Sequence, residues 1–443
     1  MRANASGPTI YRMFALSLLL WVASLAASLL AALKWAGTDP LATSFPFHHA
    51  NSLAGLLGNF AILTGLLGGG MVMTAFNEGG GVKSPAALKW AVNGWIALSV
   101  IAAAAGILHI GGSWGEIALS PIIVIAILIM LVIFVGLLLG ARPDPTAAVL
   151  IIGVVFAALG LLLNLLPAGD IQLAVMQDTL GQGSLYFIGY PLAGIGLAFW
   201  LAGRFSRVSP EWIQQGVFSC GALAIFAGIC LTAARLTTVV EGGIPQIVSM
   251  VGIVVIPLAY IIIAAHIYRT LSERNGTATL ANHWTALAAL CWLIGAVLSA
   301  ILAIPGVSLY VTGTQLAQAQ TALFGLGVLA IILGMVNQSG AELRGENTRI
   351  TGLMPFWLVA FGGIGAVLLQ AAAGVAQIFT TRVLGVGFLD TEAAIAPLYL
   401  LRAACLILLA AGALIYLAGF WIRRPYIHHD TEAASGMAGA TNA

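Results

Sequence analysis

Long apolar runs alternate with short polar breaks along almost the whole chain. Breaks at charged residues, proline, glycine and asparagine leave segments of about 20 residues or more, the length a helix needs to cross a bilayer core. Twelve such segments occur, over residues 11–33, 49–75, 86–109, 118–140, 146–167, 183–203, 212–236, 244–268, 283–305, 310–336, 352–380 and 395–421. The pattern therefore predicts an all-α polytopic membrane protein with twelve transmembrane helices.

The composition agrees with this pattern. Of the 443 residues, 60% are hydrophobic and 7% are charged, whereas soluble domains carry about 25% charged residues. A soluble globular domain and a disordered chain are therefore excluded, and the net charge of +2 does not favour nucleic-acid binding. The cysteines lie in apolar segments without CxxC or CxxCH spacing, so a thiolate metal site or a covalently attached haem is not expected.

The 17 basic residues are distributed unevenly between the two sides of the predicted bundle. With a cytoplasmic N-terminus, thirteen Lys and Arg residues fall on the inner side and only four on the outer side, namely Lys34, Arg235, Arg382 and Arg402. The positive-inside rule predicts this orientation, and an even number of helices places the C-terminus inside as well. We expect one helical domain over 1–429 in a bacterial or archaeal cytoplasmic membrane, followed by a disordered cytoplasmic tail over 430–443.

Polar side chains from several predicted helices share one depth in the outer half of this topology. They are His48, His49, His109, Tyr190, Arg235, Thr237, Thr238, Gln315, Gln318, Gln320 and Arg402. Taken singly, each is explained by an interhelical hydrogen bond, an interfacial position or snorkelling to the head groups. Because polar groups in a membrane are expensive to bury, their shared depth favours a common polar pocket.

Several of these segments resemble subunit I of the haem–copper oxidase superfamily, in its nitric oxide reductase and C-type oxidase branch. His48 and His49 precede Gly58-Asn59 as the family's low-spin haem ligand precedes a Gly-Asn pair. The stretches Y-F-I-G-Y-P-L-A-G, T-T-V-V-E-G-G-I-P, A-Q-A-Q-T-A-L-F-G and Y-L-L-R-A-A-C are similar to later motifs of the family. The resemblance covers about two-thirds of the chain, and it implies a twelve-helix bundle with a metal site in its outer half.

The departures from the family pattern concern its metal ligands. In the family, six histidines hold two haems and a second metal. Five of the matching positions carry uncharged polar residues here, namely Tyr190, Thr237, Thr238, Gln318 and Gln320. One histidine remains, as either His48 or His49. Thr and Gln are weak neutral oxygen donors that do not replace imidazole as ligands of copper or haem iron.

Acidic residues are also missing where the family uses them. The predicted helix over 183–203 contains no carboxylate, whereas the reductases place glutamates near their catalytic metal. No Lys, Asp or Glu lies in the middle of a predicted helix, where the oxidases build a proton channel. We therefore predict no catalytic residues and no metal site, and we expect that the chain by itself is not an enzyme.

Three functions are compatible with these residues. The favoured one is a cofactor-free, non-catalytic subunit of a respiratory or other redox complex, bound to membrane and periplasmic subunits such as a cytochrome c-type protein. The second is an electron-transfer subunit linked to quinol or cytochrome c, with one b-type haem held by His48 or His49 and a second ligand such as His109 or Gln320. The third is a channel or transporter for a small molecule or proton, built on the emptied site, although half-helix breaks and acidic coupling residues are absent.

Overall fold

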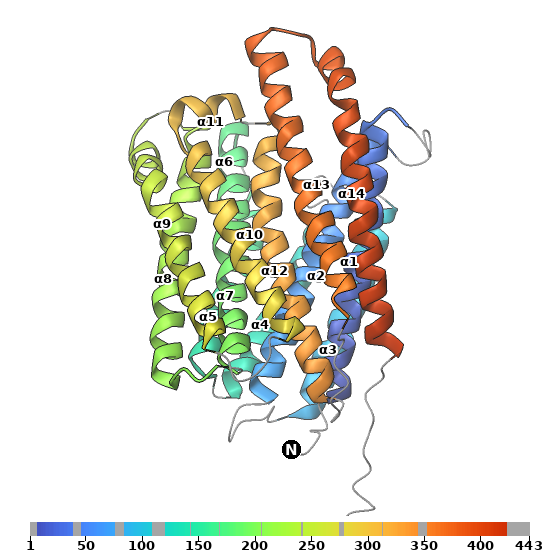
Figure 1. Ribbon diagram of the computed structural model, residues 1–443, viewed down its shortest axis with the longest axis vertical. Coiled ribbons are helices and arrows are strands. Elements are labelled where there is room, and N and C mark those ends of the chain that lie inside the picture. Colours follow the sequence, from blue (N-terminus) through green and yellow to red (C-terminus); the bar gives the residue numbers. More distant parts are fainter. Residues whose placement is uncertain are drawn as a thin grey trace, which may run out of the picture.

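The computed structural model is a bundle of long helices packed side by side (Figure 1). It describes residues 7–38, 46–75, 84–108, 120–141, 143–167, 169–204, 206–240, 242–273, 279–311, 313–343 and 352–422. Within these ranges, 12 helical segments are long and apolar enough to cross a membrane, which confirms the number predicted from the apolar pattern. His109 and the predicted tail over 430–443 lie outside the described residues.

The helical elements follow one another along the chain, with two π-helical turns, η1 and η2, among the α-helices. They are α1 (Gly7–Trp35), α2 (Phe47–Ala75), α3 (Pro85–Ile107), α4 (Pro121–Gly140), α5 (Pro145–Leu163), α6 (Ile171–Gln182), η1 (Gly183–Gly189), α7 (Tyr190–Gly203), α8 (Pro210–Leu236), α9 (Ile244–Ser272), α10 (Leu280–Leu302), α11 (Pro305–Val311), α12 (Gln315–Leu343), α13 (Met354–Ile378), η2 (Phe379–Val383) and α14 (Phe388–Ile422). The words outer and inner below refer to the orientation predicted from the basic residues.

Local sequence explains where several helices begin. Ser84, Ser120, Asp144 and Ser209 cap α3, α4, α5 and α8, because each side chain accepts a hydrogen bond from a backbone amide in the first turn. A proline follows each cap. Proline suits this position because its ring fixes φ near the helical value and it lacks the N–H group that would have no helical partner there.

Two outer boundaries differ from the predicted ones and bring carboxylates into the spans. The sixth span starts at Ile171 rather than 183, because α6, η1 and α7 continue into one another over 33 residues, and it thereby includes Asp178. The twelfth starts at Phe388 rather than 395 and includes Glu392. The expectation of a sixth helix without a carboxylate therefore holds only for its inner part.

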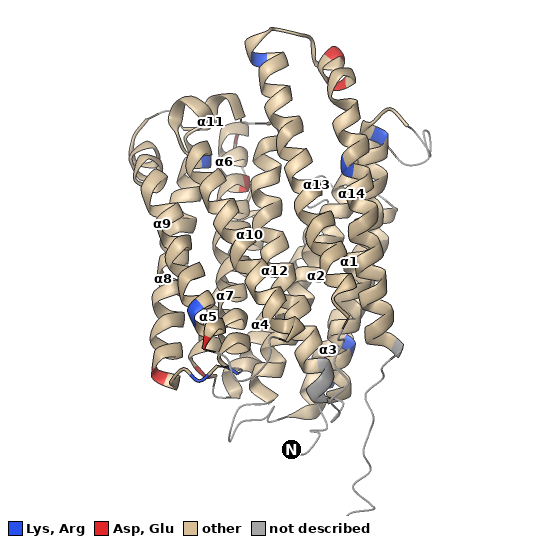
Figure 2. Cartoon of the chain, viewed as in Figure 1, with Lys and Arg blue, Asp and Glu red and all other residues tan. Residues whose placement is uncertain are grey.

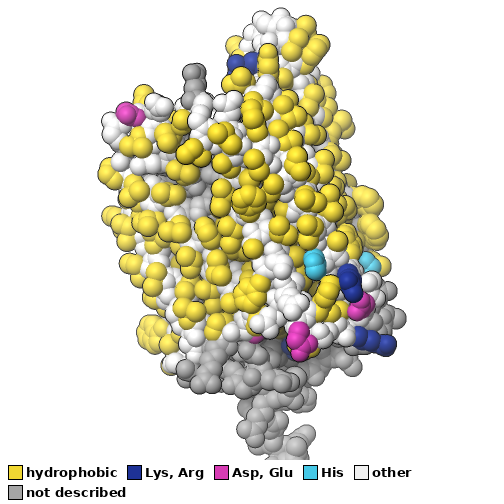
Figure 3. Space-filling model, turned by 90° about the vertical axis from the view of Figure 1, so that its left-hand side faces the viewer, with side chains coloured by type: hydrophobic (Ala, Val, Ile, Leu, Met, Phe, Trp, Pro, Cys, Tyr) yellow, Lys and Arg dark blue, Asp and Glu magenta, His cyan; other side chains and the backbone are white. Residues whose placement is uncertain are grey.

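Three spans form the centre of the bundle. The most apolar windows of α2 and of the α6–η1–α7 span are each 89% buried and that of α12 is 83% buried, against 28% for α4. The face drawn in Figure 3 is covered largely by hydrophobic side chains, and large hydrophobic residues are exposed on many of the helices, as contact with lipid requires. Charged side chains gather at the two ends of the bundle (Figure 2). The chain is thus a multi-pass membrane protein.

Small residues let α5 and α8 approach the continuous α6–η1 segment closely. A Cβ atom on Gly160 would lie 2.6 Å from the carbonyl oxygen of Gly181, and one on Gly228 would lie 2.6 Å from that of Phe187. These neighbours are backbone atoms, which cannot rotate away. The packing follows the small-residue interfaces of membrane helices, where the backbones themselves come into contact.

Candidate functional site

Tyr190 begins α7 directly after the π-helical turn η1, and it is 1% exposed. Its hydroxyl group donates to Oδ1 of Asn59 on α2 at 3.1 Å, and Nδ2 of Asn59 donates to the hydroxyl of Tyr186 at 2.8 Å. The two tyrosine rings meet edge to face with centroids 5.7 Å apart. Tyr190, which the motif resemblance aligns with a metal ligand of the family, therefore takes part in a buried hydrogen-bond network with α2.

Thr237 and Thr238 follow the last residue of α8. The hydroxyl of Thr237 donates to the carbonyl of Ala234 at 2.7 Å, and the hydroxyl of Thr238 donates to the carbonyl of Arg235 at 2.8 Å. Both side chains thus satisfy carbonyl groups at the end of their own helix, which lack helical partners. Their local role is to terminate α8.

Arg235 connects α8 with α6 and α12. Its guanidinium lies 4.6 Å from the centre of the Phe187 ring and donates to Thr321 Oγ1 at 2.8 Å and to Gln182 Oε1 at 3.4 Å. Gln182 in turn donates to Asp178 Oδ2 at 3.0 Å. The residue pattern did not identify this carboxylate, although Asp178 and Gln182 lie four residues apart and so share one helix face.

A chain of glutamines connects α12 with α13 and α14. Nε2 of Gln370 donates to Oε1 of Gln315 at 3.1 Å and to Oε1 of Gln318 at 3.2 Å. Oε1 of Gln377 accepts from the Gln315 backbone amide at 3.2 Å, and its Nε2 donates to Glu392 at 3.3 Å. Gln370 and Gln377 were not among the predicted pocket residues. Their spacing of seven residues, which places both on one helix face, was the available signal.

Gln320 points to the other side of α12. Its Nε2 donates to Ser299 Oγ on α10 at 2.8 Å, and the side chain is 4% exposed. Two residues on a helix differ in direction by about 200°, so Gln318 and Gln320 cannot face one common neighbour. The two positions that resemble haem ligands are therefore engaged with different helices, α13 and α10.

His49 is the buried member of the histidine pair at the start of α2, and His48 is exposed. Nε2 of His49 lies 2.6 Å from the carbonyl oxygen of Gly106 on α3. A ring nitrogen that bonds a carbonyl oxygen must carry the proton, so Nε2 has no free lone pair for a metal. The imidazole is held toward α3.

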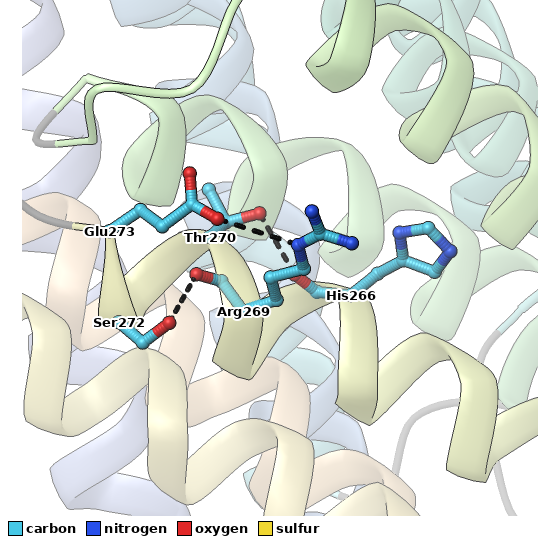
Figure 4. A network of polar contacts seen from close by, with 5 residues as sticks. All are labelled: His266, Arg269, Thr270, Ser272 and Glu273. Carbon is cyan, nitrogen blue, oxygen red and sulfur yellow. Dashed lines mark hydrogen bonds and ion pairs between the residues drawn. The ribbon is translucent and has the colours of Figure 1, made fainter.

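The two described inner histidines, His266 and His283, lie on different helices, α9 and α10. His266 projects away from the hydrogen bonds and ion pair near the end of α9, where Arg269 Nε lies 3.4 Å from Glu273 Oε1 (Figure 4). The ring of His283 packs against Phe356 with centroids 5.6 Å apart. Within the described ranges, no group of three or more His, Cys, Asp and Glu residues could hold a metal ion.

The donor set does not fit the cofactors that the resemblance implies. The resemblance implies imidazole ligands from several helices for copper and haem iron. In the described outer half, imidazole comes from His48 and His49 on α2, and the other helices offer amide, hydroxyl and carboxylate oxygens. The amide of Gln320 and Nε2 of His49 are each bonded within the protein. No haem or copper chemistry can therefore be assigned to these residues.

The arrangement of the helices matches a solved structure. It is a haem–copper terminal oxidase dimer determined by cryo-electron microscopy, with a TM-score of 0.67, 12% sequence identity, and coverage of 95% of this chain and 84% of that chain. The chain has a haem–copper oxidase subunit I-like fold. At this identity the likeness concerns the fold alone. No protein-family model matches the chain, and neither does any curated protein sequence.

Proposed function

We propose that the chain is a non-catalytic, subunit I-like membrane subunit of a redox complex that has lost the haem and copper ligands of its structural relatives. One observation carries the proposal. The side chains at all five ligand-like positions form hydrogen bonds within the protein, these positions being Tyr190, Thr237, Thr238, Gln318 and Gln320. Replacement of imidazole by such neutral, internally bonded groups maintains helix packing but supplies no redox ligand.

Such a subunit would act through its contacts with other proteins. The proposed partners are membrane and periplasmic subunits of the complex, among them a cytochrome c-type subunit, within a cytoplasmic membrane. The solved oxidase is described as a dimer, so a second copy of this chain is a further partner to test. Cross-linking of intact membranes followed by mass spectrometry would identify which of these partners is present.

The single-haem alternative has weaker support. A b-type haem between α2 and α12 would need one axial ligand from each helix. Nε2 of His49 is directed to α3 and the amide of Gln320 to α10, so both would have to break a hydrogen bond and change direction. That reorganisation adds to the free-energy cost of binding.

An optical and metal analysis of the intact complex tests the proposal. The complex is purified in a mild detergent, and its reduced-minus-oxidised spectrum, pyridine haemochrome, iron and copper are measured per chain. We expect neither haem nor copper bound stoichiometrically to this chain. One b-type haem per chain that disappears in His49→Ala and persists in the control His283→Ala would contradict the proposal and support the single-haem alternative.

A further inference from the structure

The central helices α2 and α12 carry exposed residues near their outer ends. They run in the same direction, and a Cβ on Gly325 would lie 4.0 Å from Cδ1 of Ile62. Seven residues toward the outer end of each helix, about two turns, Gly55 and Gln318 occupy matching positions, and both are exposed. A Cβ on Gly55 would meet no atom within 4 Å. Two helices that are otherwise deeply buried therefore carry exposed residues at matching outer positions, and the space beside Gly55 and Gln318 is called the outer opening below.

Arg402 points from α14 into the bundle. It lies on the same helix face as Tyr399 and Leu406, which are 1% and 5% exposed. Nε of Arg402 and the hydroxyl of Tyr399 are buried and have no hydrogen-bond partner. Within the described part of the chain no ion pair to Arg402 is found. Glu392, which accepts a hydrogen bond from Trp35, is ten residues away on α14, about 15 Å along the axis.

Arg402 and the outer opening lie at a similar depth. A Cβ on Gly365 of α13 would lie 2.9 Å from Sγ of Cys405 on α14, and the two helices are antiparallel. Three residues closer to the outer end of each helix, Arg402 on α14 is level with Leu368 on α13. Gln370 is two residues from Leu368, so it lies within one turn of the level of Arg402. Gln370 in turn bonds Gln318, which borders the outer opening.

We propose that this region binds an acidic amphiphile. Its single anionic head group, a phosphate or a carboxylate, would lie at Arg402 and Tyr399, and its hydrocarbon tail in the outer opening beside Gly55. Guanidinium binds either anion through paired N–H groups, and the tyrosine hydroxyl adds a donor. A cation held inside a membrane bundle needs a counter-charge. The inference rests on the proposed function in one respect, because a core without haem leaves the outer opening free.

One negative charge on the ligand matches its surroundings, because Arg402 is the cation of the proposed site and the carboxylate of Glu392 lies on the same helix face as Tyr399, where it would repel a second negative charge. Gln318 and Asn51 border the outer opening as exposed amides, and an amide does not compensate a second charge. Two sources supply this chemistry, namely an anionic phospholipid and a free fatty acid. They differ in phosphorus content and in the number of hydrocarbon chains, so one experiment can separate them.

Binding of defined lipids tests the proposal. The full chain, with any partners that copurify, is delipidated in a neutral detergent and titrated with phosphatidylglycerol, oleic acid and zwitterionic phosphatidylcholine, with occupancy measured by native mass spectrometry. We expect one equivalent of phosphatidylglycerol or oleic acid to bind, and about tenfold weaker binding in Arg402→Gln, which corresponds to loss of about 1.4 kcal/mol. Tyr399→Phe should also weaken binding about tenfold, as expected for loss of one hydrogen bond to a charged group.

Matched variants separate binding from folding. Arg382→Gln removes an exposed outer arginine and should leave binding unchanged. Gly55→Leu should fill the outer opening and exclude the tail while retaining Arg402, whereas Gly136→Leu, on α4, is the control because a Cβ there also meets nothing within 4 Å. If Arg402→Gln does not fold, the Gly55→Leu comparison decides.

Failure of this inference can be distinguished from failure of the proposed function. Binding of neither acidic lipid, or equal binding by Arg402→Gln and Arg382→Gln, overturns the inference. Each sample is also examined for b-type haem. A stoichiometric haem would overturn the proposed function, whereas a haem-free chain that binds no acidic amphiphile would overturn only the inference.

Discussion

Two regions of the outer half, both close to ligand-like positions, differ in how tightly their helices pack. In the closed region, where α5, η1 and α8 meet, a Cβ on Gly228 would lie 2.6 Å from a backbone oxygen. In the open region, beside the outer ends of α2 and α12, a Cβ on Gly55 would meet nothing within 4 Å. The comparison shows that ligand-like positions occur both where backbones come close together and where amide side chains hydrogen-bond to one another.

The largest expected effect is steric and lies in the closed region. A Cβ on Gly153 of α5 would lie 2.7 Å from the carbonyl oxygen of Gly189, and this backbone cannot yield without displacing the helix. Gly153→Val should therefore destabilise the protein by about 3 kcal/mol, at the upper end of overpacking penalties, or prevent folding. The measurement is the apparent Tm in detergent, together with the fraction that elutes as a single species in size exclusion.

The same substitution in the open region provides the contrast. Gly55→Val should change stability by less than about 0.5 kcal/mol, the range of substitutions that meet no packed atoms, and Gly136→Val on α4 should match it. If Gly55→Val proved as harmful as Gly153→Val, the outer opening would not exist in the folded protein.

The next largest effect concerns the buried network on α2. Asn59→Ala removes the partners of both Tyr186 and Tyr190, leaving the hydroxyl of Tyr190 buried without an acceptor. We expect a loss of about 2 kcal/mol, because an unsatisfied buried group costs its desolvation energy. Thermal unfolding of Asn59→Ala and of the double variant Asn59→Ala/Tyr190→Phe measures this. The double variant should recover part of the loss, and no recovery would contradict the proposed pairing.

A smaller effect is expected from the glutamine chain of the open region. Gln370→Leu breaks the hydrogen bonds to Gln315 and Gln318. Interhelical hydrogen bonds in membrane proteins contribute about 0.6 kcal/mol on average, so the expected destabilisation is about 1 kcal/mol. The control Gln214→Leu changes an exposed glutamine near the inner end of α8. Equal midpoints for the two variants in thermal unfolding would show that the chain adds no stability.

The smallest effect marks the lower limit of the series. Arg269 and Glu273 form an ion pair with side chains 60% and 46% exposed. Exposed i,i+4 pairs contribute about 0.3–0.5 kcal/mol, so Glu273→Gln should lower stability by no more than that and lose its effect in high salt. A shift comparable to that of Asn59→Ala, measured in parallel at low and high salt, would contradict this assignment.

Much of the fold follows from local features of the chain. The twelve spans, their apolar outer faces and the starts at Ser84, Ser120 and Asp144 depend on segment length and on residues within one turn of each other. The motif resemblance, which rests on short local patterns, also agrees with the observed subunit I-like fold. The start of the sixth span was missed because residues 171–182 are less apolar than the rest of that helix.

The sequence by itself determined that this is a twelve-helix membrane bundle whose ligand-like positions lack imidazole. Only the tertiary structure decided which polar groups meet. Gln318 and Gln320 are neighbours in sequence but bond α13 and α10, and Asp178 joins Arg235 through Gln182. The physical reason is that a span depends on its own length and hydrophobicity, whereas a hydrogen-bond partner depends on which helix faces pack together.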